Sequence, residues 1–333
     1  MGKLPNTELK KLLNCIKKDP RVLIPPTIGY DSGVHRMGDK YVVVSTDPCT
    51  GVPDDWFGWL LVNYAASDVA LFGARPEFCT INLLGPSGTK LQIFQKIMAQ
   101  ACRAADELNM AIITGHTGYY ENICETIGVC MVYGTVEPDR LLTPGNAKKR
   151  DLILCTKPLG LETLTNLSLI RKTFAQELFG IKESERLANS VQQQSCVKEA
   201  LLLAGIKGVH AMHDATEGGF VSALNEMADA SKLGFKIDID KLPISSQILK
   251  LQEAFELTQD QVLSMSSTGM ILAAVDPEAK QEVSDALHNK GVEPVFVGVF
   301  TKEKKRLLFK EEKEMLFPRL ADDCYARIIR KKA

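Results

Sequence analysis

Runs of β-branched and apolar residues alternate with helical patterns along the whole sequence, and this alternation constrains the fold more than any single motif. Phe78–Leu84 is typical of a strand, and Met110–Ile113 is typical of another. Between them, Leu91–Leu108 carries apolar residues on one face at helical spacing. Because strands and helices mix in both halves of the chain, the expected fold class is α/β or α+β.

The same periodicities predict the remaining elements. Further strands are expected at Tyr41–Ser45, Glu125–Val136, Asp151–Thr156, Gly208–Met212, Phe235–Ile239, Met270–Val275 and Pro294–Phe300. Further helices are expected at Thr7–Lys18, Trp56–Phe72, Leu161–Phe174, Glu185–Ala204, Phe220–Ala230 and Pro277–Asn289. The length of 333 residues favours two domains. The turn Pro144-Gly145-Asn146 is the best boundary, which divides the chain into residues 1–148 and 149–333.

Charge and composition exclude several classes of protein. Forty basic residues balance forty-one acidic ones, whereas general nucleic-acid binding needs clustered Lys and Arg. The one basic cluster in the sequence is the tail, residues 327–332. No apolar run reaches the roughly 20 residues of a membrane span, and the N-terminus lacks a signal-peptide pattern, so a cytoplasmic location is expected. The nine cysteines never form C-x-x-C, which argues against a disulfide framework or a structural zinc site.

Polar residues follow directly where three of the expected strands end. The first set is Ser45-Thr46-Asp47, the second is Thr114-Gly115-His116-Thr117, and the third is His213-Asp-Ala-Thr-Glu-Gly-Gly219. Strand ends and the loops after them are the usual place for ligand-binding residues in α/β proteins. No Walker A loop, G-x-S-x-G or H-E-x-x-H motif accompanies them.

Three aspartates near the first strand end are candidate metal ligands. Asp47 suits Mg²⁺, which prefers carboxylate oxygens, but an Asx turn or a helix cap would explain it equally simply. Asp68 interrupts the apolar pattern of Trp56–Phe72. It either faces solvent or is buried beside a cation or hydrogen-bond donor, because an unpaired buried carboxylate costs several kcal/mol. Asp31 lies in a glycine-flanked segment and has an ordinary turn as its alternative.

The third set contains two adjacent glycines, more than a turn requires. Gly218 and Gly219 would present unobstructed N–H groups at the positive end of a helix dipole, which is a natural site for a phosphate or an oxyanion. The alternative is a helix start capped by Asp214 or Thr216, in which Gly219 only eases packing.

Taken in order, these segments resemble the aminoimidazole ribonucleotide (AIR) synthetase superfamily, also called PurM-like, and within it the HypE-like members. The matching segments are residues 29–34 (GYDSGV), 45–47 (STD), 62–63 with 67–76 (VN, SDVALFGARP), 114–117 (TGHT), 213–219 (HDATEGG) with Glu226, and 267–269 (STG). The resemblance implies an N-terminal domain that dimerises by joining sheets into a barrel, a C-terminal α/β domain, and an ATP site between domains.

The resemblance also implies roles for individual residues. Asp31, Asp47 and Asp68 match acidic positions that bind Mg²⁺ and phosphate, and Asp31, Asp47 and Asp214 are the candidate catalytic residues. The implied cofactor-binding set consists of Asp31, Asp47, Asp68, Thr114, Gly115, His116, Thr117, Asp214, Thr216, Gly218 and Gly219. The expected cofactors are ATP and Mg²⁺, and the expected partners are a small-molecule substrate and a second copy of the chain, with neither nucleic acid nor a membrane.

Several positions depart from the superfamily pattern. Glu217 stands where many members carry Arg, and His116 replaces the usual Asp or Glu. The C-terminal cysteine of HypE proteins has no counterpart at the end of this chain. Cys15 superficially resembles the reactive position of selenophosphate synthetases, but it lies in a stretch expected to be helical. Cys49 is either a thiol that accepts a substrate group or a small apolar filler.

The resulting expectation is an Mg-ATP-dependent enzyme that phosphorylates an oxygen of a small carbonyl, carboxylate or phosphate substrate. Two alternatives stay open. One is a kinase of the thiamine-monophosphate type, in which phosphoryl transfer is the final step. The other is a nucleotide-binding assembly partner without turnover, which Glu217 favours.

Overall fold

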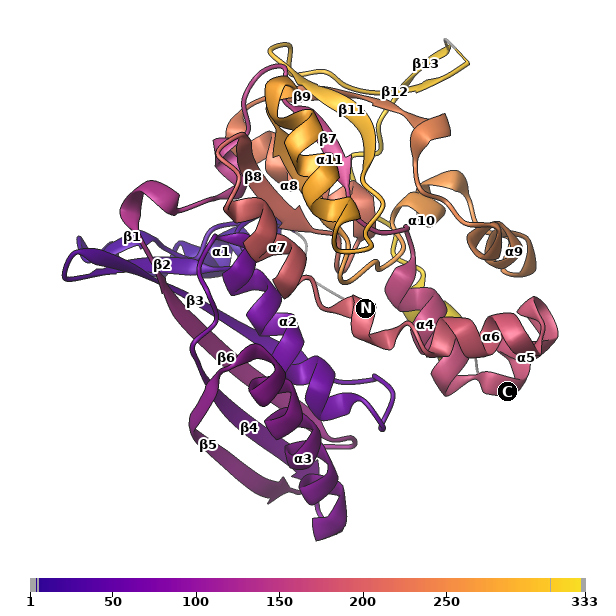
Figure 1. Ribbon diagram of the computed structural model, residues 1–333. Coiled ribbons are helices and arrows are strands. Elements are labelled where there is room, and N and C mark those ends of the chain that lie inside the picture. The colour runs from indigo at the N-terminus through magenta and orange to yellow at the C-terminus, as the bar shows by residue number, and fades with distance from the viewer. Residues whose placement is uncertain (1–3, 5, 312, 331–333) are drawn as a thin grey trace. The chain divides into compact units, whose positions relative to one another are not determined.

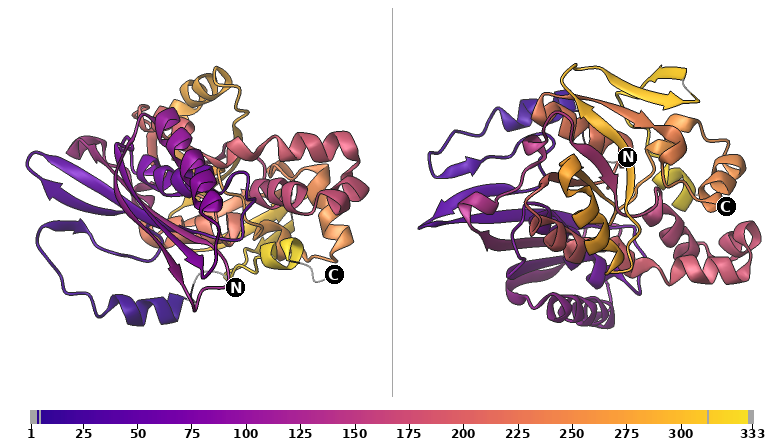
Figure 2. Two further views of the ribbon diagram at one scale, coloured as in Figure 1. Left: turned by 90° about the horizontal axis from the view of Figure 1, so that it is seen from below. Right: turned by 45° about the horizontal axis from the view of Figure 1, so that its top comes forward.

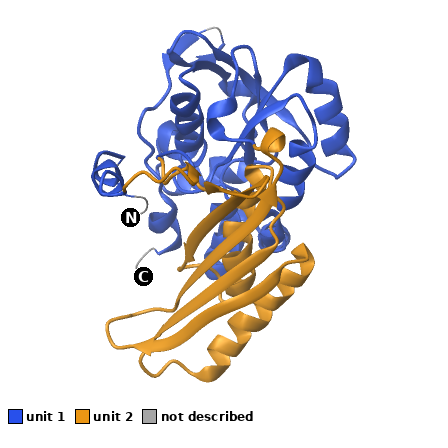
Figure 3. Cartoon of the chain, turned by 90° about the vertical axis from the view of Figure 1, so that its left-hand side faces the viewer, with its two compact units in different colours: residues 1–16, 28–30, 142–333 blue, residues 17–27, 31–141 orange. Residues whose placement is uncertain are grey.

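The computed structural model describes residue 4 and residues 6–311 and 313–330, and Figure 1 shows its elements. The chain forms two compact units (Figure 3). Residues 17–27 and 31–141 form one unit, called here the N-unit. Residues 1–16, 28–30 and 142–333 form the other, called the C-unit. The structural division therefore falls at 141/142, and two short N-terminal segments associate with the C-unit.

The N-unit is a six-stranded sheet with helices α2 and α3 against it. Its strands are β1 (Val22–Ile24), β2 (Gly33–Met37), β3 (Lys40–Cys49), β4 (Phe78–Pro86), β5 (Ala111–Tyr120) and β6 (Ile127–Val136), and its helices are α2 (Phe57–Leu71), α3 (Leu91–Leu108) and the single turn η1 (Pro138–Arg140). The strand order is β1-β2-β3-β6-β4-β5. Only β4 and β5 run parallel, and α3 connects them. The sheet is open, with β1 and β5 at its edges, so the described strands of a single chain form no closed barrel.

Helix α2 is buried on almost every side, as its apolar sequence predicts. It contacts α3 as well as strands β3 and β6 (Figure 2, left). Gly58 makes the contact with α3 possible, because a Cβ there would lie 1.9 Å from the carbonyl oxygen of Ile97. This packing fixes the face of α2 that carries Asp68 against the sheet.

Two of the expected strand ends are wrong. Strand β3 continues through Asp47 to Cys49, because β6 pairs with it along its whole length, up to Cys49 opposite Gly128. Strand β5 continues through residues 114–117 to Tyr120, so these residues form no loop. Threonine is a good strand former, and a β-bulge at Ile113 absorbs the change of register.

The C-unit is built on a seven-stranded sheet of order β13-β12-β9-β11-β7-β10-β8. Its strands are β7 (Leu152–Cys155), β8 (Val209–Asp214), β9 (Gly234–Asp238), β10 (Ile271–Val275), β11 (Val295–Thr301), β12 (Arg306–Lys310) and β13 (Lys313–Leu316). The pairs are antiparallel except for β12 beside β9. The hairpin of β12 and β13 was not predicted from the sequence, because its strands are short and highly charged (Figure 2, right).

Helices pack against this sheet and also form a separate helical cluster. The α-helices of the C-unit are α1 (Asn6–Leu13), α4 (Leu161–Ile170), α5 (Lys172–Phe179), α6 (Ile181–Ala188), α7 (Val197–Ala204), α8 (Gly219–Ser231), α9 (Ser246–Ala254), α10 (Gln259–Leu263), α11 (Lys280–His288) and α12 (Tyr325–Ile329). The short 3₁₀ turns are η2 (Pro144–Asn146), η3 (Val191–Gln194), η4 (Ile239–Lys241) and η5 (Pro277–Ala279). The expected helix Glu185–Ala204 is interrupted by η3, and the expected helix Thr7–Lys18 ends at Leu13.

Two hydrophobic cores hold the C-unit. In the first, α8 buries Phe220, Leu224 and Met227 against strand residues such as Leu272 and Phe235. In the second, α4, α5, α6, α9, α10 and α12 pack around one another. The first core sets the position of the turn between β8 and α8. Within the described part of the chain, no helix is both long and apolar enough to cross a membrane.

Candidate functional site

In the N-unit, strand β3 and helix α2 bring two of the candidate aspartates to a single serine. The Oγ of Ser45 lies 2.7 Å from a carboxylate oxygen of Asp68 and 3.1 Å from the main-chain oxygen of Asp31. Both neighbours are acceptors, and a hydroxyl has only one proton to donate. Of the two alternatives for Asp68, the buried one is confirmed, since the residue is 5% exposed and accepts a hydrogen bond from Ser45.

Asp47 projects from the same face of β3 as Ser45, because side chains alternate along a strand. Cys49 follows on that face and is buried, with its sulfur 3.8 Å from the main-chain oxygen of Phe57 at the start of α2. This position fits the apolar-filler alternative for Cys49. Cys15 is exposed in the turn after α1, outside the helix in which it was expected.

The donor set between β3 and α2 fits a hard cation. It offers the carboxylates of Asp47 and Asp68, and the main-chain oxygen of Asp31 lies close to them at Ser45. Oxygen atoms are the ligands that hard cations prefer. In the described structure, the carboxylates of Asp31, Asp47 and Asp68 do not all lie within 4.8 Å of one another. They therefore do not form a closed cage around a metal ion. Mg²⁺ usually keeps several waters and bridges to substrate phosphates, so a loose pair of carboxylates suits it better than a cage.

The second candidate segment lies away from these aspartates in the same sheet. Register places Asp47 opposite Cys130, Cys130 opposite Ile81, and Ile81 opposite Gly115. Three strand spacings, roughly 14 Å, therefore separate β3 from β5 along this row. Gly115 is required by close packing, because a Cβ there would lie 2.1 Å from the oxygen of Ile81. Thr114, His116 and Thr117 are exposed on the edge strand, where the His116 ring contacts Tyr120 at 2.8 Å.

In the C-unit, the third segment forms the turn from β8 into α8. Gly218 and Gly219 both have positive φ, of 82° and 55°, which strongly favours glycine. A Cβ on Gly218 would lie 2.2 Å from the Oγ of Ser222, and one on Gly219 would lie 2.3 Å from the oxygen of Met265. Both glycines are therefore needed for the turn itself.

The amides of these glycines are not unobstructed, and that expectation is wrong. The N–H of Gly218 donates to the Asp323 carboxylate at 3.0 Å, and the N–H of Gly219 donates to the oxygen of Thr216 at 2.8 Å. The capping alternative is also wrong, because the N-cap residue of α8 is Gly218 and no side chain caps it. An acid from the C-terminal segment thus occupies the place expected for an anion.

His213 is held between acceptors on both sides of its ring. Nδ1 lies 2.8 Å from the oxygen of Asp214, and Nε2 lies 3.0 Å from a carboxylate oxygen of Glu226 on α8. A main-chain oxygen and a carboxylate both accept, and a ring nitrogen donates to them when it carries a proton. The ring also lies 3.7 Å from the Asp214 carboxylate. Glu226 and His213 therefore lock the end of β8 to α8.

Asp214 is the candidate residue that has a buried oxygen without a hydrogen bond in the described part of the chain. It is 2% exposed, and its Oδ1 has no hydrogen-bond partner among the described residues. Buried carboxylate oxygens are normally paired. Asp214 therefore remains a strong candidate for contact with a cation or a donor from a ligand.

A second acidic group near this turn was missed by sequence reasoning. Glu162 on α4 is buried and accepts hydrogen bonds from the hydroxyls of Ser266 and Thr268, at 2.7 and 2.5 Å. Burial raises the pKa of Glu162, and the charges of Asp323 and Glu217 add to the increase. Burial also raises the pKa of Asp323. Neither Glu162 nor Asp323 lies in a motif, so only the fold reveals them.

Comparison with known proteins agrees with this arrangement of segments. Residues 29–136 match the AIR synthase related protein N-terminal domain, and residues 149–309 match the corresponding C-terminal domain. The chain belongs to the AIR synthase-related family. The resemblance found in its motifs is thereby confirmed.

Individual relatives within this family span most of the chain. A putative hydrogenase expression/formation protein of Methanocaldococcus jannaschii is 29% identical, over 84% of this chain and 82% of that protein. A selenide, water dikinase of Myxococcus xanthus is also 29% identical, over 76% of this chain and 70% of its own length. A crystal structure of the hydrogenase maturation protein HypE in complex with ATP superimposes with a TM-score of 0.68 at 18% identity, covering 95% and 91% of the two chains. The mixed α/β two-domain fold is therefore that of the family.

Proposed function

We propose that this chain is an Mg-ATP-dependent enzyme that phosphorylates an oxygen of a small carbonyl, carboxylate or phosphate substrate. Membership of the AIR synthase-related family supports the proposal, as does similarity to a dikinase and to the fold of an ATP-bound protein. The structural observation that carries it is the buried Asp68 carboxylate, held by Ser45, which lies two residues before Asp47 on the same face of β3. A buried acid beside a second acid is costly unless a cation or donors compensate for it.

Asp47 and Asp68 would hold Mg²⁺, together with Asp31. A bound magnesium ion would neutralise charge on the phosphates of ATP and orient them. The protein's own contribution is positional. Ser45 fixes the rotamer of Asp68, and the packing of α2 on β3 sets the distance of Asp68 from Asp47.

The turn after β8 would contribute through side chains instead of amides. Asp214 keeps a buried carboxylate oxygen without a hydrogen-bond partner in the described residues, and it is the acid we assign to the substrate or its attacking group. Thr216 belongs to the same turn. Glu226 and His213 hold Asp214 in place. Residues 1–148 would serve as the ATP-binding and dimerisation domain, and residues 149–333 as the second domain.

The proposed assembly is a homodimer that joins two N-unit sheets. Strand β5 is a ten-residue edge strand whose exposed side chains include Ile113, Tyr119 and Tyr120. Long exposed edge strands of this kind pair readily with another chain. Pairing of the β5 edges would continue the sheet into the barrel that the family resemblance implies.

The test is calorimetric titration of the full chain with ATP, with and without Mg²⁺. We expect Mg²⁺-dependent binding, which Asp47→Asn and Asp68→Asn weaken by about tenfold or more, since each variant removes a charged ligand. Asp39→Asn, in the exposed turn before β3, is the matched control and should bind normally. Circular dichroism confirms that each variant is folded. Absence of ATP binding by the folded wild-type chain would refute the proposal.

Turnover is measured separately as ADP release with candidate small carboxylates, amides and phosphate esters. Binding without ADP release for any substrate class would favour the assembly-partner alternative. In that case Glu217→Arg is the informative variant, because it restores the cation found in many superfamily members. Recovery of turnover in that variant would assign the loss to Glu217.

A further inference from the structure

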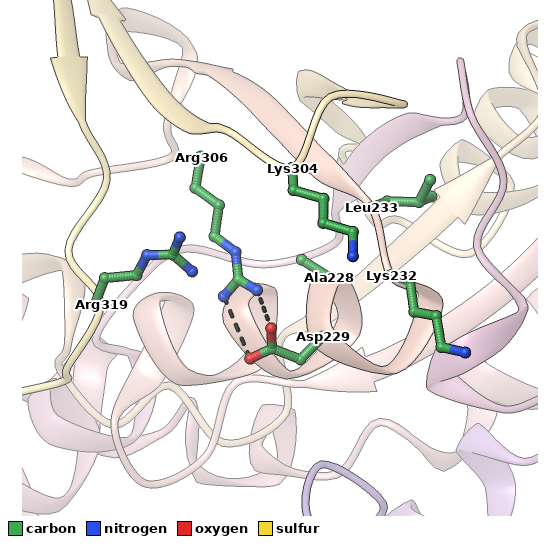
Figure 4. A pocket seen from close by; sticks show the side chains of 7 residues that line it. All are labelled: Ala228, Asp229, Lys232, Leu233, Lys304, Arg306 and Arg319. Atoms are coloured by element: carbon green, nitrogen blue, oxygen red, sulfur yellow. Dashed lines mark hydrogen bonds and ion pairs between the residues drawn. The ribbon is translucent and has the colours of Figure 1, made fainter.

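The C-unit carries a basic cavity at the opposite end of α8 from the glycine turn. It has a volume of about 220 Å³ and is lined by Ala228, Asp229, Lys232, Leu233, Lys304, Arg306 and Arg319 (Figure 4). The cavity lies at the C-terminal end of α8. Gly218 lies at the other end of that helix, roughly 20 Å away at 1.5 Å per residue.

The lining brings together cations from three separated segments. Lys232 ends α8, Lys304 precedes β12, and Arg319 follows β13. Lys304 and Arg319 lie on either side of Arg306, with the Arg319 guanidinium pointing toward it (Figure 4). This cluster corrects the expectation that the tail is the only basic cluster; tail residues 331 and 332 lie outside the described residues.

Arg306 supplies a buried positive charge to the cavity, and its guanidinium is held in place by hydrogen bonds. Its side chain is only 6% exposed, it forms an ion pair with Asp229, and it donates to the Oδ1 of Asn225 at 2.5 Å. Its Nε is buried without a hydrogen-bond partner among the described residues. Asp229 is the only acid in the lining, and its side chain is 72% exposed. One solvated carboxylate therefore faces four cations.

Such an excess of positive charge is unusual for a chain whose net charge is −1. The helix dipole accounts for Lys232, because a cation is favourable at a helix C-terminus. It does not account for Lys304 and Arg319, which come from other segments and pair with no acid in the described part of the chain. Converging Lys and Arg side chains are the usual means of binding phosphate groups, with Arg supplying paired donors.

The volume of the cavity limits the size of the anion that it can hold. At about 220 Å³ it is smaller than the roughly 300–1,000 Å³ of pockets for drug-sized ligands. A neighbouring hollow of about 320 Å³ shares Lys304, Arg306 and Arg319 and adds one cation, Lys305, and one acid, Glu314. The anion of a small ligand would sit in the first cavity, and any remainder would extend into the more apolar second one, beside Leu307 and Phe317.

We propose that this cavity is a second, magnesium-independent site that binds the diphosphate group of a small molecule. Lys304 and Arg319 would contact the phosphate oxygens directly, and Arg306 would supply a fixed charge behind them. The site is separate from the proposed nucleotide site and does not depend on it.

The test is calorimetric titration of the full chain with inorganic pyrophosphate, at low ionic strength and with EDTA present to remove divalent cations. We expect one binding event, weakened about tenfold or more in the double variant Lys304→Gln/Arg319→Gln. Arg306 is left intact, since its bonds to Asn225 and Asp229 support the fold. Lys302→Gln is the matched control, because Lys302 is exposed in the same loop and lines neither cavity.

Four results would overturn the proposal. The first is that wild-type protein binds no pyrophosphate. The second is that Lys302→Gln lowers the affinity as much as the double variant does, which would indicate general surface charge. The third is that citrate binds as tightly as pyrophosphate, which would contradict the assigned ligand class. Asp47→Asn should leave pyrophosphate binding unchanged; if it abolishes binding, the anion occupies the proposed nucleotide site instead.

Discussion

At the scale of single residues, the turn after β8 shows how the fold redistributes roles that a motif suggests. Gly218 and Gly219 were expected to offer amides to a ligand, yet both amides bond within the chain. Asp323, which is remote in sequence, accepts one of them and also accepts the N–H of Tyr325. No local pattern could have predicted this bond, because it depends on the path of the chain after β13.

Asp323 should therefore stabilise the turn. Asp323→Ala leaves the N–H groups of Gly218 and Tyr325 without their acceptor, and the unpaired donor of the buried Gly218 costs about 1–3 kcal/mol. We expect urea denaturation to show a loss of about 1–3 kcal/mol in the free energy of unfolding. The control is Asp322→Ala, next in sequence and exposed, which should change stability by less than about 0.5 kcal/mol. Equal losses in the two variants would contradict the assignment.

The buried Glu162 makes a prediction about pH. Burial raises the pKa of Glu162 above its ordinary value of 4.5, so the folded state holds its proton more tightly than the unfolded state does. Its contribution to stability is therefore full below about pH 4.5 and is lost as the pH rises through the folded pKa. Glu162→Gln removes this loss, and it should be more stable than wild type near pH 7 but not near pH 4.

Thermal or urea denaturation across this pH range measures the difference between variant and wild type. Glu217→Gln is the control, because Glu217 is exposed and affects the pKa of Glu162 only through its charge. It should reproduce a small part of the effect at most. A Glu162→Gln variant that is less stable than wild type at pH 7 would show that hydrogen bonds from Ser266 and Thr268 outweigh the cost of burial.

At the scale of elements, strong apolar periodicity predicted helix bounds correctly, whereas polar residues within a strand wrongly predicted its end. Helix α3 spans Leu91–Leu108, as its apolar stripe predicts. Strands β3 and β5 were expected to end where Asp47 and Thr114 appear, but cross-strand pairing carries both strands further. Pairing depends on partners that are distant in sequence, such as β6 for β3, and no local window contains that information. The same pairing separates Asp47 from Gly115, although both lie in matching motifs.

The edge strand β5 makes a prediction about assembly. Ile113→Lys places a charge on the exposed face of the edge, which natural proteins use to prevent pairing with another chain. We expect light scattering after size-exclusion chromatography to show a dimer for wild type and a monomer for the variant. Leu316→Lys, an exposed leucine on β13, is the matched control and should remain dimeric. A wild-type monomer, or a dimeric Ile113→Lys, would contradict the proposed interface.

At the scale of the whole molecule, nucleotide binding should appear as stability. A ligand at one hundred times its dissociation constant adds about 2.7 kcal/mol to the free energy of unfolding of the part that binds it. We expect Mg-ATP to raise the midpoint of thermal denaturation of wild type and to leave Asp47→Asn unchanged. Pyrophosphate with EDTA should instead stabilise Asp47→Asn and fail to stabilise Lys304→Gln/Arg319→Gln. The opposite pattern would mean that the two sites are wrongly assigned.

Fold class and family could be predicted from the sequence because the ordered motifs extend over both units. The basic cavity could not be predicted, since Lys232, Lys304 and Arg319 meet only after α8 and the β12–β13 hairpin are in place. The same is true of the contact between Gly218 and Asp323. Sequence patterns describe neighbours along the chain, whereas both of these features join segments far apart in it.

The strand order of the C-unit also determines when, during translation, each strand can pair with its neighbours. Strand β7 lies inside the sheet, yet both of its partners, β10 and β11, lie more than 100 residues later in the chain. All strands of the N-unit sheet are synthesised by residue 136, so that sheet can assemble during translation of the C-unit. Strand β7 must wait until residue 301 has emerged before both of its edges are covered. During that interval its apolar residues, Leu152 to Cys155, are exposed to chaperones and to neighbouring nascent chains.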